Sequence, residues 1–265
     1  MRIAVTGGSG KLGRHVVLRL RASGHDVLNL DATGERWTGW TQVDLSDYGQ
    51  VADILGGAHG ELAPVDAVVH LAAIPAPGLA PDSVTFRVNL TATFNVLHAA
   101  IRRGITRIVI ASSETVLGLP FDTPPPYVPV DEEYAARPES VYSLGKHLEE
   151  TMAIELVRWH PEVTITALRF SNVMDVEDYA AFPGFDADAR ARKWNLWGYI
   201  DGRDGAYAVE LALARTGPGF DRFIIASPDT VMSRPNAELL AEVFPGVEVR
   251  GEIGEHTTLL SIDKA

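Results

Sequence analysis

The stretch RIAVTGGSGKLGRHVVLRL (residues 2–20) decides the fold of this chain. Apolar residues 2–6 form a strand pattern, a glycine-rich turn follows at 7–13, and residues 11–22 carry apolar side chains at helical spacing. Glycines let a backbone turn tightly and come close to a ligand, and the free N–H groups at the start of a helix face an anion. The stretch therefore predicts a phosphate-binding turn between the first strand and the first helix.

A single acidic residue indicates which dinucleotide this turn binds. Asp31 ends a second apolar strand, residues 27–30, and lies eighteen residues after Gly13. At that place a carboxylate can accept hydrogen bonds from the adenosine ribose and repel a 2′-phosphate. Lys11 and Arg14 beside the turn keep NADP as the alternative. The pattern favours NAD.

The composition narrows the class of protein. The chain has 265 residues, of which 46% are hydrophobic and 22% charged, so it can bury a full core. It has a net charge of −12 and no cysteine. The negative charge excludes the basic surface that nucleic-acid binding needs. The absence of cysteine excludes disulfides, thiolate catalysis and cysteine-ligated metals. No apolar run has the length of a membrane span, and the first residues do not form a signal peptide. We expect a cytoplasmic protein without a metal site.

Strand and helix patterns alternate through most of the chain. Strands are predicted at residues 2–6, 27–30, 41–43, 66–71, 106–111, 163–168 and 222–226, and helices at 11–22, 46–55, 83–103, 139–159 and 204–215. Continuous apolar strands that alternate with helices indicate a parallel sheet covered on both faces. The fold class is therefore α/β, a Rossmann-type doubly wound parallel sheet.

Three stretches interrupt this alternation. Residues 118–138 are rich in proline and should form a loop beyond the fifth strand, at the edge where such sheets bind ligands. Residues 172–200 are acidic and aromatic, and together with 227–265 they should form a small C-terminal substrate-binding cap. The dinucleotide-binding domain would then comprise residues 1–171 and 201–226.

The catalytic candidates lie on either side of the proline-rich loop. Tyr142 and Lys146 are four residues apart and share one face of the predicted helix. The ammonium group favours the phenolate form of the tyrosine, which can then take a proton from an alcohol while hydride leaves the same carbon. Ser113 closes the fifth strand and can orient the substrate oxygen, whereas Ser112 is better explained as a strand-end cap.

These motifs give the chain a resemblance to a known family. It resembles the extended short-chain dehydrogenases/reductases of the NAD-dependent epimerase/dehydratase group over most of residues 1–226. The motifs that carry the resemblance are the glycine loop 6–13, Asp31, the pair 44–45, HLAA at 70–73, NLTATFNVLHAA at 89–100, the trio Ser113, Tyr142 and Lys146, RFSN at 169–172, and YIDGRD at 199–204.

The resemblance implies a set of site residues. The implied cofactor contacts are Gly7, Gly10, Lys11, Leu12, Asp31, Asp44, Leu45, Leu71, Ala72, Ala73, Asn89, Tyr142 and Lys146. The implied substrate contacts are Ser113, Glu114, Tyr142 and Asn172. It also implies a homodimer through the helices at 83–103 and 139–159. From the residues alone, His70 is better explained as a hydrogen-bonded core histidine than as a ligand.

Departures from the family pattern indicate the substrate class. Dehydratases of the family carry two acids after the serine or threonine, whereas this chain has Glu114 and Thr115, so dehydration is not expected. Around residues 175–193 acids outnumber cations, which disfavours a nucleotide diphosphate. Trp194, Trp197 and Tyr199 could stack on a sugar ring or pack the cap.

Three functions follow, in order of preference. The first is an NAD-dependent dehydrogenase that oxidises a hydroxyl of a sugar, sugar acid or similar small polyol. The second is a nucleotide-sugar 4-epimerase, similar to UDP-glucose 4-epimerase, with tightly held NAD. The third is a non-catalytic regulator that senses NAD(P), which the retained Tyr142 and Lys146 disfavour.

Overall fold

A seven-stranded parallel sheet forms the centre of the computed structural model, which describes residues 1–34, 39–57 and 64–265. Its strands are β1 (Arg2–Thr6), β2 (Asp26–Asp31), β3 (Trp40–Gln42), β4 (Ala67–His70), β5 (Arg107–Ser113), β7 (Thr164–Phe170) and β10 (Gly219–Ile225). They lie in the order β10-β7-β5-β4-β1-β2-β3, and every neighbouring pair is parallel. The strand order reverses between β1 and β4, which confirms the doubly wound fold and places the ligand crevice at the carboxyl ends of these strands.

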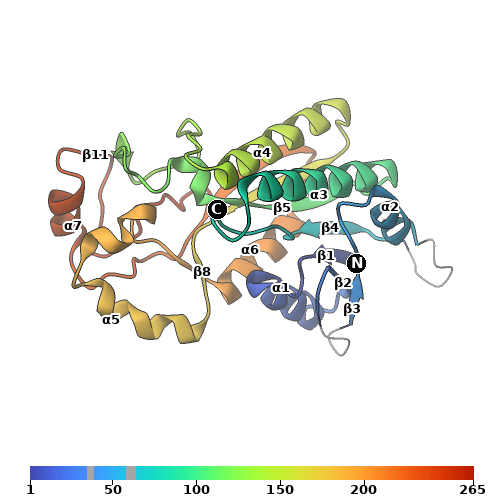
Figure 1. Cartoon of the computed structure of the whole chain (residues 1–265), viewed down its shortest axis with the longest axis horizontal. Coiled ribbons are helices and arrows are strands. Elements are labelled where there is room, and N and C mark those ends of the chain that lie inside the picture. Colours follow the sequence, from blue (N-terminus) through green and yellow to red (C-terminus); the bar gives the residue numbers. More distant parts are fainter. Residues whose placement is uncertain (35–38, 58–63) are drawn as a thin grey trace.

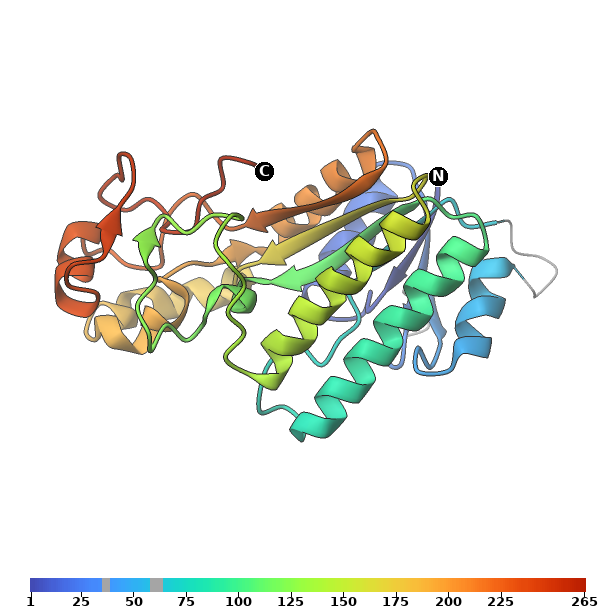
Figure 2. The ribbon, with the colours of Figure 1, turned by 90° about the horizontal axis from the view of Figure 1, so that it is seen from above.

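Helices cover both faces of the sheet. One face carries α2 (Tyr48–Gly56), α3 (Asp82–Arg102) and α4 (Val141–Trp159), and the other carries α1 (Lys11–Ala22) and α6 (Gly202–Ala214). Figures 1 and 2 show the first three side by side, and α3 contacts both of its neighbours. On the opposite face α1 packs against α6. This layering explains why the strands are apolar throughout rather than alternating.

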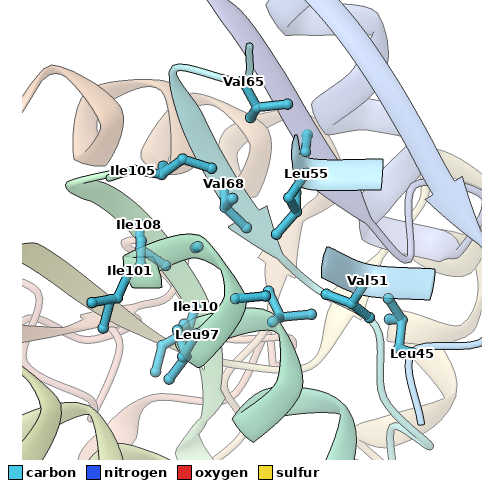
Figure 3. Packing of buried hydrophobic residues seen from close by; sticks show 14 of the residues in the cluster. Leu45, Val51, Leu55, Val65, Val68, Leu97, Ile101, Ile105, Ile108 and Ile110 are labelled. Atoms are coloured by element: carbon cyan, nitrogen blue, oxygen red, sulfur yellow. The ribbon is translucent and has the colours of Figure 1, made fainter. Parts of the chain in front are cut away.

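Two apolar cores lie against the sheet, one on each face. Val51 and Leu55 of α2 and Leu97 of α3 meet Val68 and Ile108 of the strands, as Figure 3 shows. The other face buries apolar residues of α1, α6 and the strands between them, among them Val5, Val16, Leu20, Val109 and Val209. Burying one such side chain stabilises the fold by about 1.5–3 kcal/mol, so these faces fix the frame that holds the site.

A third apolar cluster lies beyond the carboxyl edge of the sheet. The elements in this part of the molecule are short: η2 (Glu114–Leu117), β6 (Tyr127–Val128), β8 (Val173–Met174), η3 (Val176–Ala181), α5 (Phe182–Phe185), η4 (Ala189–Asn195), β9 (Ile200–Asp201), α7 (Asn236–Val243) and β11 (Glu248–Val249). Strand β6 pairs with β11, and β8 pairs with β9. Trp197 is fully buried in this cluster, which packs residues from 116–130, 174–197 and 224–260 together. We call this part of the molecule the cap cluster; Figure 1 shows its helices α5 and α7 at one end of the molecule.

The element predictions largely agree with this structure. The first strand and first helix match at both ends, and the bounds of the remaining predicted helices and strands differ by at most three residues. Residues 118–138 are a loop except for the two residues of β6. In the part of the chain that the structure describes, no helix is both long and apolar enough to cross a lipid bilayer.

Candidate active site

The glycine turn between β1 and α1 leaves no room for side chains. Gly7 adopts φ +68°, and a Cβ on it would lie 2.6 Å from the backbone N of Ala72. A Cβ on Gly13 would lie 2.0 Å from the carbonyl oxygen of Gly7. Glycine is required at both positions, because the turn packs directly on the loop after β4 and on the first turn of α1. The N-terminus of α1 consequently opens toward the crevice.

Asp31 lies against this turn at the end of β2. Its Oδ2 accepts a hydrogen bond from the backbone N–H of Ser9 at 3.0 Å, and its Oδ1 accepts from the N–H of Thr33 at 3.4 Å. The carboxylate therefore stands at the mouth of the turn, where an adenosine ribose would reach it.

A cavity of about 1200 Å³ extends from the glycine turn to the N-terminal end of α4. Every residue that the sequence resemblance implied as a site residue lines it: Gly7, Gly10, Lys11, Leu12, Asp31, Asp44, Leu45, Leu71, Ala72, Ala73, Asn89, Ser113, Glu114, Tyr142, Lys146 and Asn172. The structure thus brings together residues from eight separate stretches of the chain. Their individual roles remain predictions.

Local sequence explains why Tyr142 lies at the cavity. Ser140 caps α4: its hydroxyl accepts from the N–H of Ser143 at 3.1 Å, while the Ser143 hydroxyl accepts from the N–H of Ser140 at 2.8 Å. This reciprocal cap fixes the first turn of the helix, on which Tyr142 stands. Burial raises the pKa of Tyr142, and the ammonium group of Lys146 and the hydroxyl of Ser113 act against that rise.

Lys146 is buried one turn further along α4. Its Nζ donates to the carbonyl oxygen of Ala111 and to Oε2 of Glu149, both at 2.9 Å. Burial by itself lowers the pKa of Lys146, but Glu149, Tyr142 and Glu150 together outweigh it, so the pKa lies above its usual value. Lys146 therefore carries its positive charge beside the tyrosine. Glu149 was not among the predicted site residues.

His70 is a core histidine, as the sequence suggested. It is buried between two hydroxyls, with Nδ1 2.7 Å from Oγ1 of Thr6 and Nε2 3.0 Å from Oγ1 of Thr93. Burial and the nearby charge of Lys146 lower its pKa to about 3, so the imidazole is neutral. Asn89 is similarly engaged, because its amide donates to and accepts from the backbone of Ile74, at 3.1 and 2.8 Å. It holds the loop after β4 against the cavity.

Glu114 is a buried acid behind the substrate end of the cavity. Its Oε1 accepts from the amide of Asn195 at 3.3 Å, and burial raises its pKa to about 7 although Ser171, Asn195 and Arg192 act in the opposite direction. Of the three aromatic residues considered for ring stacking, only Trp194 lines the cavity. Trp197 is fully buried and Tyr199 donates to Asp229 at 2.9 Å, so both serve packing.

The cations of α1 contact the cap cluster. Lys11 pairs with Asp178 of η3, and Arg14 pairs with Asp175. His15 Nε2 lies 2.7 Å from Oδ1 of the same Asp175. The acids that the sequence showed in excess after residue 172 thus pair in part with the helix that follows the glycine turn.

Comparison with known proteins shows which family, relatives and solved structures this chain is similar to. The model of the NAD dependent epimerase/dehydratase family matches residues 3–193. The L-arabinose 1-dehydrogenase (NAD(P)(+)) of Haloferax volcanii is 31% identical over 196 residues, covering 68% of this chain and 74% of that protein. The UDP-glucose 4-epimerase of Bacillus subtilis is 29% identical over 189 residues, and the match spans 52% of its length. A solved structure of the Thermus thermophilus UDP-glucose 4-epimerase with NAD superposes on 100% of this chain and 91% of that one, with a TM-score of 0.70 and 25% identity.

Proposed function

Because the chain belongs to the NAD-dependent epimerase/dehydratase family, we propose that it is a dehydrogenase that oxidises one hydroxyl of a small carbohydrate with NAD. One observation carries the proposal: Ser113, Tyr142 and Lys146 line the same cavity as the glycine turn. A proton acceptor and a dinucleotide site in one cavity are what hydride transfer from an alcohol requires.

The residues of the turn fit the cofactor. The close approach of backbone at Gly7 and Gly13 leaves space that a Cβ would fill, and the start of α1 offers N–H groups to a pyrophosphate. Asp31 would receive the ribose hydroxyls of NAD and oppose a 2′-phosphate. Lys146 would also reach the nicotinamide ribose. The chemistry that bound NAD supplies is acceptance of the hydride from the carbon being oxidised.

The protein's own groups handle the proton. The Ser113 hydroxyl hydrogen-bonds the substrate oxygen and directs it to Tyr142. Tyr142 takes the hydroxyl proton as a general base, which requires the phenolate form. Lys146 favours that form through its charge, against the effect of burial. Asn89 holds the loop at Ile74 in place, which closes this part of the cavity.

Replacement of Tyr142 tests the proposal. Purified protein with NAD and a panel of sugars should produce NADH, followed by its absorbance. Tyr142→Phe keeps the ring but removes the proton acceptor, so kcat should fall by about 10²–10⁴-fold. Tyr207→Phe is the matched control, because Tyr207 is exposed on α6, and it should leave kcat unchanged. Full activity of Tyr142→Phe would rule out the assigned role.

A 4-epimerase with permanently held NAD is the second candidate, and the likeness to UDP-glucose 4-epimerases favours it. Such an enzyme would convert UDP-glucose to UDP-galactose without added cofactor and without net NADH. The chain spans about half the length of the curated 4-epimerase that it matches but 74% of the L-arabinose dehydrogenase. The excess of acids over cations around residues 175–193, which disfavours a nucleotide diphosphate, supports the dehydrogenase.

We further propose that the enzyme is a homodimer that pairs through α3 and α4. Both helices carry large apolar side chains on their solvent side: Phe86 and Phe94 on α3, and Leu144 and Ile154 on α4, each at least 37% exposed. Adjacent exposed apolar side chains of this size favour burial against a partner.

A further inference from the structure

In the part of the chain that the structure describes, no cation without a partner lines the cavity. Among the described residues that line it, Lys11 and Lys146 are the positively charged ones. Lys146 is held by Ala111 and Glu149, and Lys11 pairs with Asp178 at the cofactor end. Four carboxyl groups also line the cavity, namely Asp31, Asp44, Glu114 and Glu139.

Cations just behind the substrate end are also engaged. The guanidinium carbon of Arg192 lies 4.8 Å from the ring centroid of Trp194 and 4.9 Å from that of Phe185, and the side chain is 9% exposed. Lys193 donates to Asp122 at 2.7 Å. Arg137 and Glu139 form an ion pair, with Nε of the arginine 2.6 Å from Oε1 of the glutamate. An anion in the cavity would therefore find these groups covered or already paired.

The remaining wall at the substrate end is apolar or carries neutral polar groups. Ile74, Pro75, Leu119, Pro120, Val173 and Trp194 supply apolar surface. Hydroxyls and amides come from Ser113, Tyr142 and Asn172. An aromatic ring beside hydroxyl-binding groups suits the C–H face and hydroxyls of a sugar. A carboxylate or diphosphate would lose its water there without gaining a partner, which is costly.

From this juxtaposition of an aromatic wall, neutral polar groups and cations that are either paired or covered by aromatic rings, we propose that the substrate is uncharged: a free aldose or polyol rather than a sugar acid or a sugar nucleotide. The proposal rests on the dehydrogenase function and narrows its substrate class. Trp194 is the residue that sets this preference, because its ring separates the cavity from the charge of Arg192.

Matched substrate pairs test the proposal. NADH formation is measured with each aldose and its uronic acid, such as galactose with galacturonate and glucose with glucuronate, and with L-arabinose, polyols and UDP-glucose. We expect kcat/KM for the aldose to exceed that for its uronate by roughly tenfold or more, the size expected when a charge enters a site without a partner.

Three variants identify the cause of the preference. Trp194→Arg places a cation in the wall and should shift the uronate-to-aldose ratio of kcat/KM upward by roughly tenfold. Trp194→Gln removes the ring that covers Arg192 without adding a charge, so it should also raise the ratio, but by less than Trp194→Arg. Pro77→Arg adds a charge from the exposed loop after β4 and should raise the ratio even if Trp194→Arg folds poorly.

The possible outcomes separate this proposal from the function on which it rests. Uronates oxidised as well as or better than aldoses, with NADH formed, would overturn the uncharged substrate but keep the dehydrogenase. Interconversion of UDP-sugars without net NADH would overturn both. A panel in which no uncharged compound is oxidised, or an equal ratio change in Trp194→Arg and Trp194→Gln, would also count against the proposal.

Discussion

Glu149 controls the charge next to the catalytic pair. Its carboxylate contacts the Lys146 ammonium at 2.9 Å, and both side chains are almost completely buried. The other ionisable groups that act on Lys146 and Tyr142 are Glu150 on the same helix and Glu114 after β5. The neutral His70 on β4 is also close enough to sense the charge of Lys146. Removal of the negative charge of Glu149 must therefore lower the pKa at which the Tyr142–Lys146 pair loses its first proton.

Glu149→Gln should therefore move the pH profile. The acid limb of kcat/KM, which reports deprotonation of the Tyr142–Lys146 pair, should shift to lower pH by about one unit or more. The plateau value of kcat/KM should also fall. In part of the molecules Lys146 rather than Tyr142 loses the proton, so those molecules lack the phenolate that acts as the base. Glu155→Gln, on a more exposed part of α4, is the control and should leave the profile in place. An unshifted acid limb in Glu149→Gln would show that Glu149 is uncharged.

Glu114 makes folding stability depend on pH. Burial raises its pKa from 4.5 to about 7, so between these values the folded protein binds a proton that the unfolded chain has lost. The resulting stabilisation is complete below the unfolded pKa and is lost as pH rises through the folded pKa. The free energy of unfolding of the wild type, relative to Glu114→Gln, should fall by on the order of 3 kcal/mol from pH 4 to 8. Urea unfolding of both proteins at several pH values measures this difference. A difference in the free energy of unfolding that stays the same at every pH would contradict the prediction.

Sequence patterns identified the residues that we propose as reacting groups, but not the buried residues that contact them. Ser113, Tyr142 and Lys146 are recognisable because their types and spacing carry the chemistry. Glu149 was missed, although its position three residues after Lys146 places both side chains on one helix face. The signal was present, but charged residues at that spacing are usually exposed. Trp194 could not be separated from Trp197 by pattern alone, since only the packing of η4 decides which ring reaches the cavity.

At the scale of elements, long periodic segments were predictable and short ones were not. Helix α1 was predicted with both its ends because the glycine turn and the apolar spacing mark them. The two-residue strands β6, β8, β9 and β11 form only by pairing with segments distant in the sequence, so no local pattern predicts them. Helix α7 has eight residues and a proline cap, too little periodicity to stand out.

The exposed faces of α3 and α4 give a prediction about assembly. Phe94 on α3 is 45% exposed, and a charge there would oppose burial against a second copy. Phe94→Glu should convert the proposed dimer to a monomer, as measured by light scattering after size-exclusion chromatography. Leu18→Glu is the control, because Leu18 is 66% exposed on α1, on the opposite face of the sheet. A wild type that elutes as a monomer would remove the proposed interface.

For the whole molecule, the sheet was predictable and the cap cluster was not. The parallel doubly wound sheet and the edge at which ligands bind follow from the alternating strand and helix patterns. The cap cluster has no such rule, because it joins residues from 116 to 260 through side-chain packing and the two-residue strand pairs β6–β11 and β8–β9. The division of the chain into two domains therefore stays a prediction.

The separation of the apolar clusters has a consequence for how such an enzyme can change. Residues of the glycine turn and the strand ends beside it draw their rigidity from the cores on the two faces of the sheet, while Trp194 is placed by the cap cluster. Substitutions inside the cap cluster can reshape the sugar end of the cavity without disturbing the glycine turn. Natural selection or protein engineering can thus change which carbohydrate fits the cavity while the glycine turn and the residues around it stay the same.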